Sequence, residues 1–240
     1  ALQKYHDVLK EDPDNSLAKL SMMDYYNNIG DKTTVKTILQ ELLQSSKTEQ
    51  NTKMELLRQV ITSSQKDNNP DSTEVMRLFS VALAGPQQDA DILMLKAAYM
   101  ILCKKPKAEI NRIYEQAIEV EPDNSRARAA LIQNIWETED YDKVIAICRP
   151  AIEYNPDEMA FYYFQGMAQF QKHDSDAALM TFQKGVGQIK PDSNPDIVSD
   201  FYGIMGDILH EKGRNDEAFQ AYDSCLQWKP DNVAALNNYA

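Results

Sequence analysis

The chain has 240 residues, of which 43% are hydrophobic, and its 25 basic and 37 acidic residues give a formal net charge of −12. An acidic surface repels nucleic acid, and no apolar run is long enough to span a membrane, so we expect neither a nucleic-acid partner nor membrane insertion. Cys103, Cys148 and Cys225 are odd in number and far apart, and they imply no disulfide framework.

The N-terminal part of the sequence predicts one helix followed by a pair of helices. Residues 1–13 have the apolar spacing of a helix and end at a proline. Residues 16–47 have the spacing of two helices, which a turn at Gly30–Asp31 separates. We therefore expect residues 16–47 to form a helical hairpin.

Residues 50–86 are the least regular part of the pattern. Asn69–Pro70 is expected to cap and begin the second helix of this stretch, and Gly85–Pro86 to end it. The long polar connection before Asn69 leaves the register of the first helix open. The run from Asp67 to Asp71 lacks the glycine that a calcium loop requires, so we interpret it as a capped loop.

From residue 89 onward, prolines mark a repeating length. Pro122, Pro156, Pro191 and Pro230 are 34, 35 and 39 residues apart, and each follows a predicted helical pair. Proline cannot continue a helix, because it lacks an N–H and its ring clashes with the preceding turn. The extra residues after Pro191 include Asn194–Pro195, which we expect to lengthen the next helix by about one turn.

Small and aromatic residues recur at matching places in the last two complete pairs. They are Tyr162, Gly166, Ala178, Phe182 and Gly185 in one pair, and Tyr202, Gly206, Gly213, Ala218, Tyr222 and Cys225 in the other. With a period of 34 residues, this set resembles the tetratricopeptide repeat family over essentially the whole chain, and most strongly in its C-terminal half. The resemblance implies an all-α fold, a right-handed superhelical solenoid of antiparallel helix-turn-helix repeats.

The resemblance also implies a single solenoid over residues 1–240. Half repeats would occupy residues 1–13 and 231–240, and complete repeats approximately 16–47, 50–86, 89–122, 125–156, 158–191 and 194–230. Because the sequence begins and ends inside a helical pattern, we expect it to be a fragment of a longer chain.

In each repeat, a small residue of the first helix is expected to face a residue twelve positions later. The pairs late in the sequence consist of small residues, whereas the earlier pairs contain bulkier ones. Bulkier residues force the axes of two packed helices further apart. The pairs are Gly206/Ala218, Gly166/Ala178, Ile132/Val144, Ala98/Ile110 and Met23/Val35. We therefore expect tight packing after about residue 158 and looser packing before it.

Signals for catalysis or metal binding are poor. His210–Glu211 begins like a zinc-protease motif, but Arg214 stands where the second histidine is required. The sequence has no glycine-rich phosphate loop, no nucleophile elbow and no Cys-x-x-Cys pair. We expect no catalytic, metal-binding or cofactor-binding residues, no cofactor, and no enzymatic activity.

The family resemblance implies that the first helices line a concave groove. Carried over position by position, it gives the candidates Tyr99, Arg126, Gln133, Trp136, Tyr163, Met167, Phe170, Asp207 and Glu211. An equally weighted alternative is that the aromatic residues pack between neighbouring repeats. The basic and amide residues that clamp acidic chaperone tails are replaced here by residues such as Leu95 and Ala129, so a carboxylate clamp is not expected.

These observations favour a non-catalytic protein–protein interaction scaffold. Its groove would accept a peptide or helix with apolar anchors and a basic flank, which Asp207 and Glu211 would attract. One alternative is a docking or regulatory segment of a larger enzyme, whose catalytic domain lies outside this chain. Head-to-tail self-association through the open ends of the solenoid is a further possibility.

Overall fold

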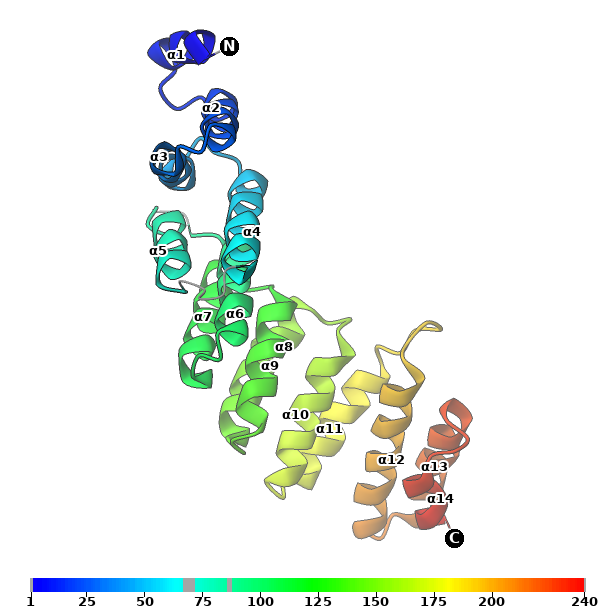
Figure 1. The fold of residues 1–240 in the computed structure, drawn as a ribbon. Coiled ribbons are helices and arrows are strands. Elements are labelled where there is room, and N and C mark those ends of the chain that lie inside the picture. Colours follow the sequence, from blue (N-terminus) through cyan, green and yellow to red (C-terminus); the bar gives the residue numbers. More distant parts are fainter. Residues whose placement is uncertain (1, 67–71, 86–87, 240) are drawn as a thin grey trace. The chain divides into compact units, whose positions relative to one another are not determined.

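The computed structural model describes residues 2–66, 72–85 and 88–239, and every regular element within these ranges is an α-helix. The predicted all-α fold of helical repeats is confirmed. The chain forms two compact units, which are unit 1 (residues 1–121) and unit 2 (residues 122–240) (Figure 1). That a single solenoid runs through residues 1–240 stays a prediction.

Unit 1 is built from consecutive helix pairs. Its described helices are α1 (Leu2–Glu11), α2 (Ser16–Asn28), α3 (Lys32–Gln44), α4 (Gln50–Lys66), α5 (Ser72–Ala82), α6 (Ala90–Leu102) and α7 (Lys107–Val120). Helix α2 packs against α3, α4 against α5, and α6 against α7, while α1 packs against α2. Each of these pairs lies within one of the repeat ranges expected from the sequence.

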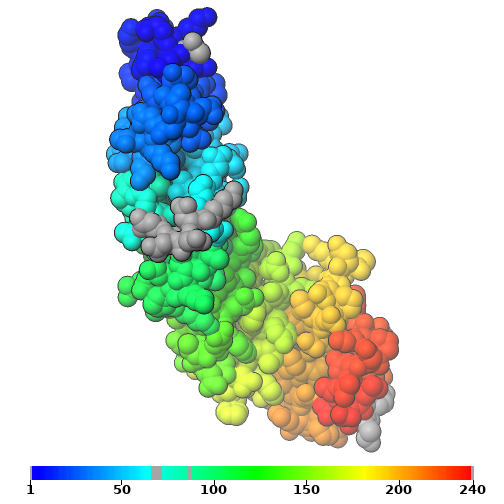
Figure 2. All heavy atoms as spheres, viewed as in Figure 1, coloured from blue at the N-terminus to red at the C-terminus, as the bar shows by residue number. Residues whose placement is uncertain are grey.

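Unit 2 follows the same plan. Its helices are α8 (Ser125–Trp136), α9 (Tyr141–Tyr154), α10 (Met159–Gln171), α11 (Ser175–Val186), α12 (Pro195–Glu211), α13 (Asn215–Trp228) and α14 (Val233–Tyr239). The pairs are α8/α9, α10/α11 and α12/α13, and α14 packs against α12 and α13. Within each unit, segments that are close in sequence also lie beside one another, as the order of colours in Figure 2 shows. This is the arrangement of a repeat protein, in which each element contacts mainly its neighbours.

Polar caps start many of these helices. A side-chain oxygen accepts a hydrogen bond from a backbone N–H of the first turn at Asn15, Asp31, Asp89, Asn124, Asp140, Asp174 and Asn194. Such a bond satisfies one of the N–H groups that a helix leaves open at its start. Helix α12 begins at Pro195 and has 17 residues against 13 in α10, so the predicted lengthening is confirmed.

The irregular stretch after residue 50 resolves into two helices. Helix α4 buries Leu56 and Leu57, which fixes the register that the sequence left open. The expected cap at Asn69–Pro70, the loop from Asp67 to Asp71 and the proposed stop at Pro86 lie outside the described residues.

A residue with positive φ joins the two helices of most pairs. These turn residues are Gly30 (80°), Lys104 (53°), Glu139 (57°), His173 (61°) and Gly213 (73°). The left-handed conformation suits glycine and strains a residue that carries a Cβ. After Lys104 the second helix begins three residues later, whereas it begins two residues later in the other four pairs.

Because of the extra turn residue, a spacing of twelve residues counted back from Ile110 leads to the wrong residue of α6. Ala97, seven residues before the turn residue, is fully buried, whereas Ala98 is exposed. The predicted pairing of Ala98 with Ile110 is therefore wrong, because a fixed spacing of twelve residues assumed a turn of constant length. Ile110 itself is buried.

In two pairs of unit 2, the position seven residues before the turn residue is a close contact between helices. In α10 and α12 this position is Gly166 and Gly206, where an added Cβ would lie 2.6 Å from the Phe182 ring and 2.4 Å from the Tyr222 ring. Such distances leave no room for a side chain unless the ring moves, so packing is tight at both glycines, but the predicted contacts with Ala178 and Ala218 are not the nearest ones. The atoms nearest to each glycine belong to the aromatic ring sixteen residues later, and not to the alanine twelve residues later.

Apolar side chains form a core in each unit. Leu42, Leu57 and Phe79 are fully buried in unit 1, and Phe182 and Phe201 are fully buried in unit 2. Burial of such side chains is the main favourable contribution to folding.

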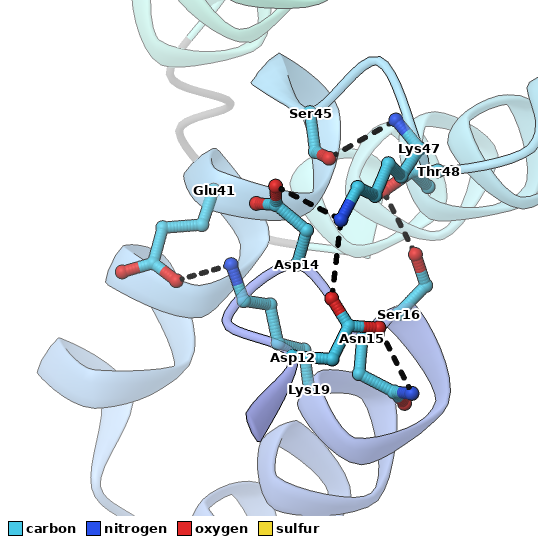
Figure 3. A network of polar contacts seen from close by, with 9 residues as sticks. All are labelled: Asp12, Asp14, Asn15, Ser16, Lys19, Glu41, Ser45, Lys47 and Thr48. Atoms are coloured by element: carbon cyan, nitrogen blue, oxygen red, sulfur yellow. Dashed lines mark hydrogen bonds and ion pairs between the residues drawn. The ribbon is translucent and has the colours of Figure 1, made fainter. Parts of the chain in front are cut away.

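A polar network joins the loop after α1 to the loop after α3 (Figure 3). The Lys47 ammonium lies 3.2 Å from an oxygen of Asp12 and 3.7 Å from one of Asp14. Nearby, Lys19 pairs with Glu41 at 2.9 Å. The Lys47 contacts connect the loop after α1 to the loop after α3, and the Lys19–Glu41 pair connects α2 to α3.

Candidate functional site

The candidate residues of unit 2 lie on the first helices of its pairs, and α10 contacts both α8 and α12. Their side chains differ in exposure. Arg126, Gln133 and Glu211 are exposed, whereas Trp136, Tyr163, Met167, Phe170 and Asp207 are half-buried. These eight residues therefore all keep some contact with solvent.

Tyr99 is a packing residue of unit 1. Its side chain is only 3% exposed, and its ring centroid lies 6.1 Å from that of Phe79. The expectation that Tyr99 lines an open groove is corrected, because the face of α6 that carries it is turned into the core.

Aromatic rings join the first helices of unit 2. The Trp136 ring lies 5.4 Å from that of Tyr141 and 5.8 Å from that of Phe164, centroid to centroid. The Tyr163 ring is stacked on Phe201, with 6.1 Å between centroids and 7° between planes. Part of each ring therefore packs between helices, as the alternative interpretation of the aromatic residues proposed.

Three of the candidates meet in one pocket. Phe170 from α10 and Asp207 and Glu211 from α12 line a pocket of about 330 Å³, together with His210, Tyr222 and Asn238. The pocket combines aromatic rings with two carboxyl groups. Such a lining suits a group that is both apolar and positively charged.

A second pocket of about 200 Å³ shares Asp207 with the first. Its lining also includes Tyr163, Asp200 and Ile204, together with Asn232 just before α14 and Ala235 within α14. The structure thus brings Tyr163 to the same carboxylate as Phe170. Arg126, Gln133, Trp136 and Met167 line neither of these two pockets.

Asp207 is held by two neighbours. The Tyr222 hydroxyl and the Asn238 Nδ2 group each donate a hydrogen bond to its Oδ1 atom, both at 2.7 Å. Burial, followed by the bond to Asp207, raises the pKa of Tyr222 above its usual range. Both of these hydrogen bonds go to one carboxylate oxygen of Asp207, so Oδ2 is the oxygen available to a ligand.

Asp200 adds a second carboxyl group beside Tyr163. Desolvation, with a contribution from Asp196, raises the pKa of Asp200, while Lys229 opposes the shift. Burial and the charge of Asp200 raise the pKa of Tyr163 in turn. A cation in this pocket would relieve the unfavourable environment of the Asp200 carboxylate.

The sequence did not identify Tyr222 and Asn238 as members of this site. Tyr222 lies on a second helix, and Asn238 lies on α14, so a rule that takes only first-helix positions of complete repeats omits both. The signal that could have identified Tyr222 is its spacing of sixteen residues from Gly206, because this spacing places the Tyr222 ring against α12.

The described residues offer no metal centre. Within residues 2–66, 72–85 and 88–239 no three histidine, cysteine, aspartate or glutamate side chains are arranged to hold a metal ion. No helix in those ranges is both long enough and apolar enough to cross a membrane. Burial raises the pKa of the Cys148 thiol to about 12, although Arg128 opposes the shift, so this thiol is inert at neutral pH.

Comparison with known proteins gives one sequence match and a shared fold. Residues 199–232 match the family model of the tetratricopeptide repeat. No curated protein matches the chain.

Several solved structures of MamA have the same fold. A crystal structure of MamA is 18% identical, with a TM-score of 0.51 over 60% of this chain and 80% of that chain. A MamA RS-1 ArsTM double mutant is 13% identical, with a TM-score of 0.54 over 75% of this chain and 97% of that one. A MamA fragment from Desulfovibrio magneticus RS-1 is 13% identical, with a TM-score of 0.52 over 75% and 97%. At these identities the likeness concerns the fold alone.

Proposed function

We propose that this chain, a tetratricopeptide repeat protein, is a non-catalytic scaffold whose unit 2 binds a segment of a partner protein. Proteins of this repeat class are typically scaffolds for protein–protein interaction, which is the coarse function that the repeats indicate. The finer proposal concerns the surface formed by α10, α12 and α14. It rests on the pocket that holds Phe170, Asp207 and Glu211 together.

The chemistry of that pocket selects a basic, partly apolar side chain. The half-buried Phe170 ring offers apolar area, and a guanidinium or ammonium group within about 6 Å of a ring face is attracted to it. Asp207 Oδ2 and the exposed Glu211 carboxylate would receive the charge. A lysine or arginine buries its methylene stem while its head group stays near water, so it fits such a site.

The neighbouring pocket would hold the next part of the partner. Tyr163 and Ile204 provide apolar contacts there, and the Asn232 amide provides a hydrogen-bonding group. A segment that crosses both pockets would place an apolar anchor beside Tyr163 and a basic residue beside Glu211. Arg126, Gln133, Trp136 and Met167 stay proposed contacts for a longer segment.

Selection from a random peptide library on the intact chain tests this proposal. We expect the selected peptides to share an apolar anchor followed by Lys or Arg. The variant Glu211→Lys should bind the selected peptides at least about tenfold more weakly, since it replaces attraction by repulsion.

The matched control is Glu153→Lys, which makes the same charge change at an exposed position of α9. It should leave binding unchanged apart from a small general effect of charge. Peptides without basic residues, or equal losses in both variants, would contradict the proposal.

A further inference from the structure

The turn between α6 and α7 places exposed apolar and basic side chains next to each other. Ile101 and Leu102, the last two residues of α6, are 54% and 55% exposed. Lys104, Lys105 and Lys107 follow them, and all three are exposed. No other stretch of four residues in the sequence contains three basic residues. Large exposed aliphatic groups beside a concentrated positive charge are typical of a contact surface.

The charges of Lys104 and Lys105 are available to a partner. Within residues 2–66, 72–85 and 88–239, neither of these two ammonium groups pairs with a carboxylate. The sequence also has no acidic residue from position 92 to position 108. A surface that carries carboxylates would therefore be attracted to this turn.

Backbone hydrogen bonds hold the turn in one conformation. Lys104 adopts φ = 53°, and its N–H group donates to the Ile101 carbonyl at 2.9 Å. The Lys105 N–H group donates to the Met100 carbonyl, also at 2.9 Å. These two bonds after a left-handed residue form a Schellman motif. A segment that is ordered before binding loses little conformational entropy when it binds.

Unit 2 is the more acidic of the two units. It contains 10 basic and 19 acidic residues, whereas unit 1 contains 15 basic and 18 acidic residues. The acidic residues of unit 2 include Asp200, Asp207 and Glu211, which line the two pockets described above. The turn after α6 therefore complements this surface in charge.

The order of groups in the turn also matches the ligand proposed for unit 2. That ligand has an apolar anchor beside Tyr163 and a basic residue beside Glu211. In the turn the exposed Leu102 comes first, and Lys104 and Lys105 follow two and three residues later. The chain thus contains a segment of the kind that its own unit 2 is proposed to bind.

We propose that the segment bound by unit 2 is the turn between α6 and α7 of a second copy of this chain. This inference rests on the function proposed for unit 2. Leu102 would be the apolar anchor beside Tyr163. Lys104 or Lys105 would pair with the exposed Glu211 carboxylate. The contact does not involve the two ends of the chain.

Such a contact is heterologous, because it joins two different surfaces. Each copy offers one turn and one pair of pockets, so a dimer still has one free turn and one free pair of pockets. Association can then continue into a ring or into an open chain of copies.

Sedimentation of the intact chain over a range of concentrations tests the proposal. At low salt we expect the average mass to rise with protein concentration. Added salt should lower the average mass, because salt screens exposed charges. A chain that stays monomeric at every concentration at low salt would overturn the proposal.

Matched variants show which surfaces make the contact. Lys104→Asn with Lys105→Asn removes both charges, and asparagine tolerates the positive φ at the first position. We expect this variant and Glu211→Lys each to associate at least about tenfold more weakly. The control is Lys32→Asn with Lys36→Asn, which makes the same change of net charge at two exposed positions of α3 and should associate normally.

Mixing the two impaired variants tests the pairing of turn and pocket. The double asparagine variant keeps its pockets, and the Glu211→Lys variant keeps its turn. Exactly one productive contact is then possible between them, and neither chain can extend it. We therefore expect the mixture to form a complex with one copy of each variant, although neither variant associates alone. A mixture that stays monomeric would overturn the proposal.

Two further results would also overturn it. Association that is lost in the double asparagine variant but kept in Glu211→Lys would place the turn on another surface. Binding of the intact chain to vesicles that contain phosphatidylserine, without self-association, would assign the turn to an anionic membrane surface. The peptide selection on unit 2 is read separately. Basic peptides selected by a chain that stays monomeric contradict only this inference, whereas selected peptides without basic residues contradict the proposed function.

Discussion

Two glycines of α12 show how a single Cβ decides packing. An added Cβ at Gly206 would lie 2.4 Å from the Tyr222 ring, whereas at Gly203 it would lie 3.5 Å from the Cys225 sulfur, an ordinary contact. Alanine favours a helix over glycine by about 1 kcal/mol at both positions. We expect Gly203→Ala to be neutral or stabilising, and Gly206→Ala to destabilise the fold by about 1–3 kcal/mol through overpacking.

Urea unfolding of both variants measures the difference. The comparison is internally controlled, because the two substitutions are chemically identical and lie one helical turn apart. Equal stabilities would mean that the Tyr222 ring can move aside without cost, and that the glycine is not required for the approach of α12 and α13.

The hydrogen bond from Tyr222 to Asp207 predicts sensitivity to alkali. Burial and this bond raise the pKa of Tyr222 in the folded chain. An unfolded tyrosine loses its proton near pH 10. The stability gained from the neutral hydroxyl is therefore complete below about pH 10 and is lost as the pH rises through the higher folded pKa.

We expect the free energy of unfolding to fall above about pH 10, and to fall less in Tyr222→Phe. At pH 7 that variant should lose about 1 kcal/mol, the usual contribution of one hydrogen bond. Tyr154→Phe is the control, since Tyr154 is 53% exposed and should leave the alkaline fall unchanged. An equally steep fall in Tyr222→Phe would assign the effect to other groups.

The turns between paired helices are where element geometry is set. His173 adopts φ = 61° despite its Cβ, whereas Gly213 has φ = 73° at the equivalent place. A left-handed conformation costs a residue with a Cβ about 1–2 kcal/mol, part of which the greater chain entropy of glycine offsets. We expect His173→Gly to stabilise the chain by about 0.5–1 kcal/mol, and Gly213→Ala to destabilise it by about 1 kcal/mol.

Thermal melts of the two variants check the sign of each change. An added Cβ at Gly213 meets no atom within 4 Å, so a loss of stability there comes from the backbone and not from a clash. A less stable His173→Gly would indicate that the histidine side chain makes a compensating contribution in its turn.

Helix positions could be predicted from the sequence because they depend on local rules. Apolar spacing, polar caps and prolines place the helix pairs, and Asn194 with Pro195 even gives the start of α12. The packing face of α6 could not be predicted in the same way. The extra residue after Lys104 shifts the fixed spacing by one position, and neighbouring residues of a helix point about 100° apart, since a turn takes 3.6 residues.

That one-residue shift explains the error at Tyr99. The fixed spacing made Ala98 the contact residue and directed its neighbour Tyr99 to the groove. With Ala97 in contact instead, Tyr99 is 3% exposed, whereas Ile101 and Leu102 are 54% and 55% exposed. The position of a helix is encoded locally, but a fixed spacing finds its buried face only where the turn that follows has the expected length.

Three lining residues of the pocket could be predicted from first-helix positions alone, while their role in binding stays a proposal. Phe170, Asp207 and Glu211 meet in one pocket, and each had been selected by position. Tyr222 and Asn238 were missed because they reach the pocket through the packing of α13 and α14 on α12, which no position along a single helix reveals.

At the scale of the whole molecule, stability is expected to vary along the chain. Helix α1 has no buried residue, and the loop that follows it is held by the ion pairs of Lys47. A repeat protein opens locally where neighbour contacts are few. We expect the backbone amides of α1 to exchange with solvent faster than those of α2 and α3.

Hydrogen exchange read by mass spectrometry checks this gradient. Lys47→Ala should accelerate exchange in α1 and in the loop after it, because Asp12 and Asp14 lose their partner. Lys4→Ala, an exposed lysine of α1 itself, is the control. High salt should act like Lys47→Ala, since it screens exposed charges. If neither Lys47→Ala nor high salt altered the exchange rate of the α1 amides, apolar contacts alone would hold this helix.

The fit of the Tyr222 ring against Gly206 also constrains how such repeats can diverge. The side chains at two positions sixteen residues apart fill one space. A larger residue at one position therefore causes a clash, and a smaller residue leaves a void, unless the other position changes as well. In α8/α9 the same two positions hold Ile132 and Cys148, both fully buried, with the larger side chain on the first helix and the smaller on the second. A sequence comparison that scores each position separately counts two mismatches between these pairs. It does not register that each pair combines one large and one small side chain in the interior. A repeat can therefore lose its family resemblance in sequence while its interior stays the same size.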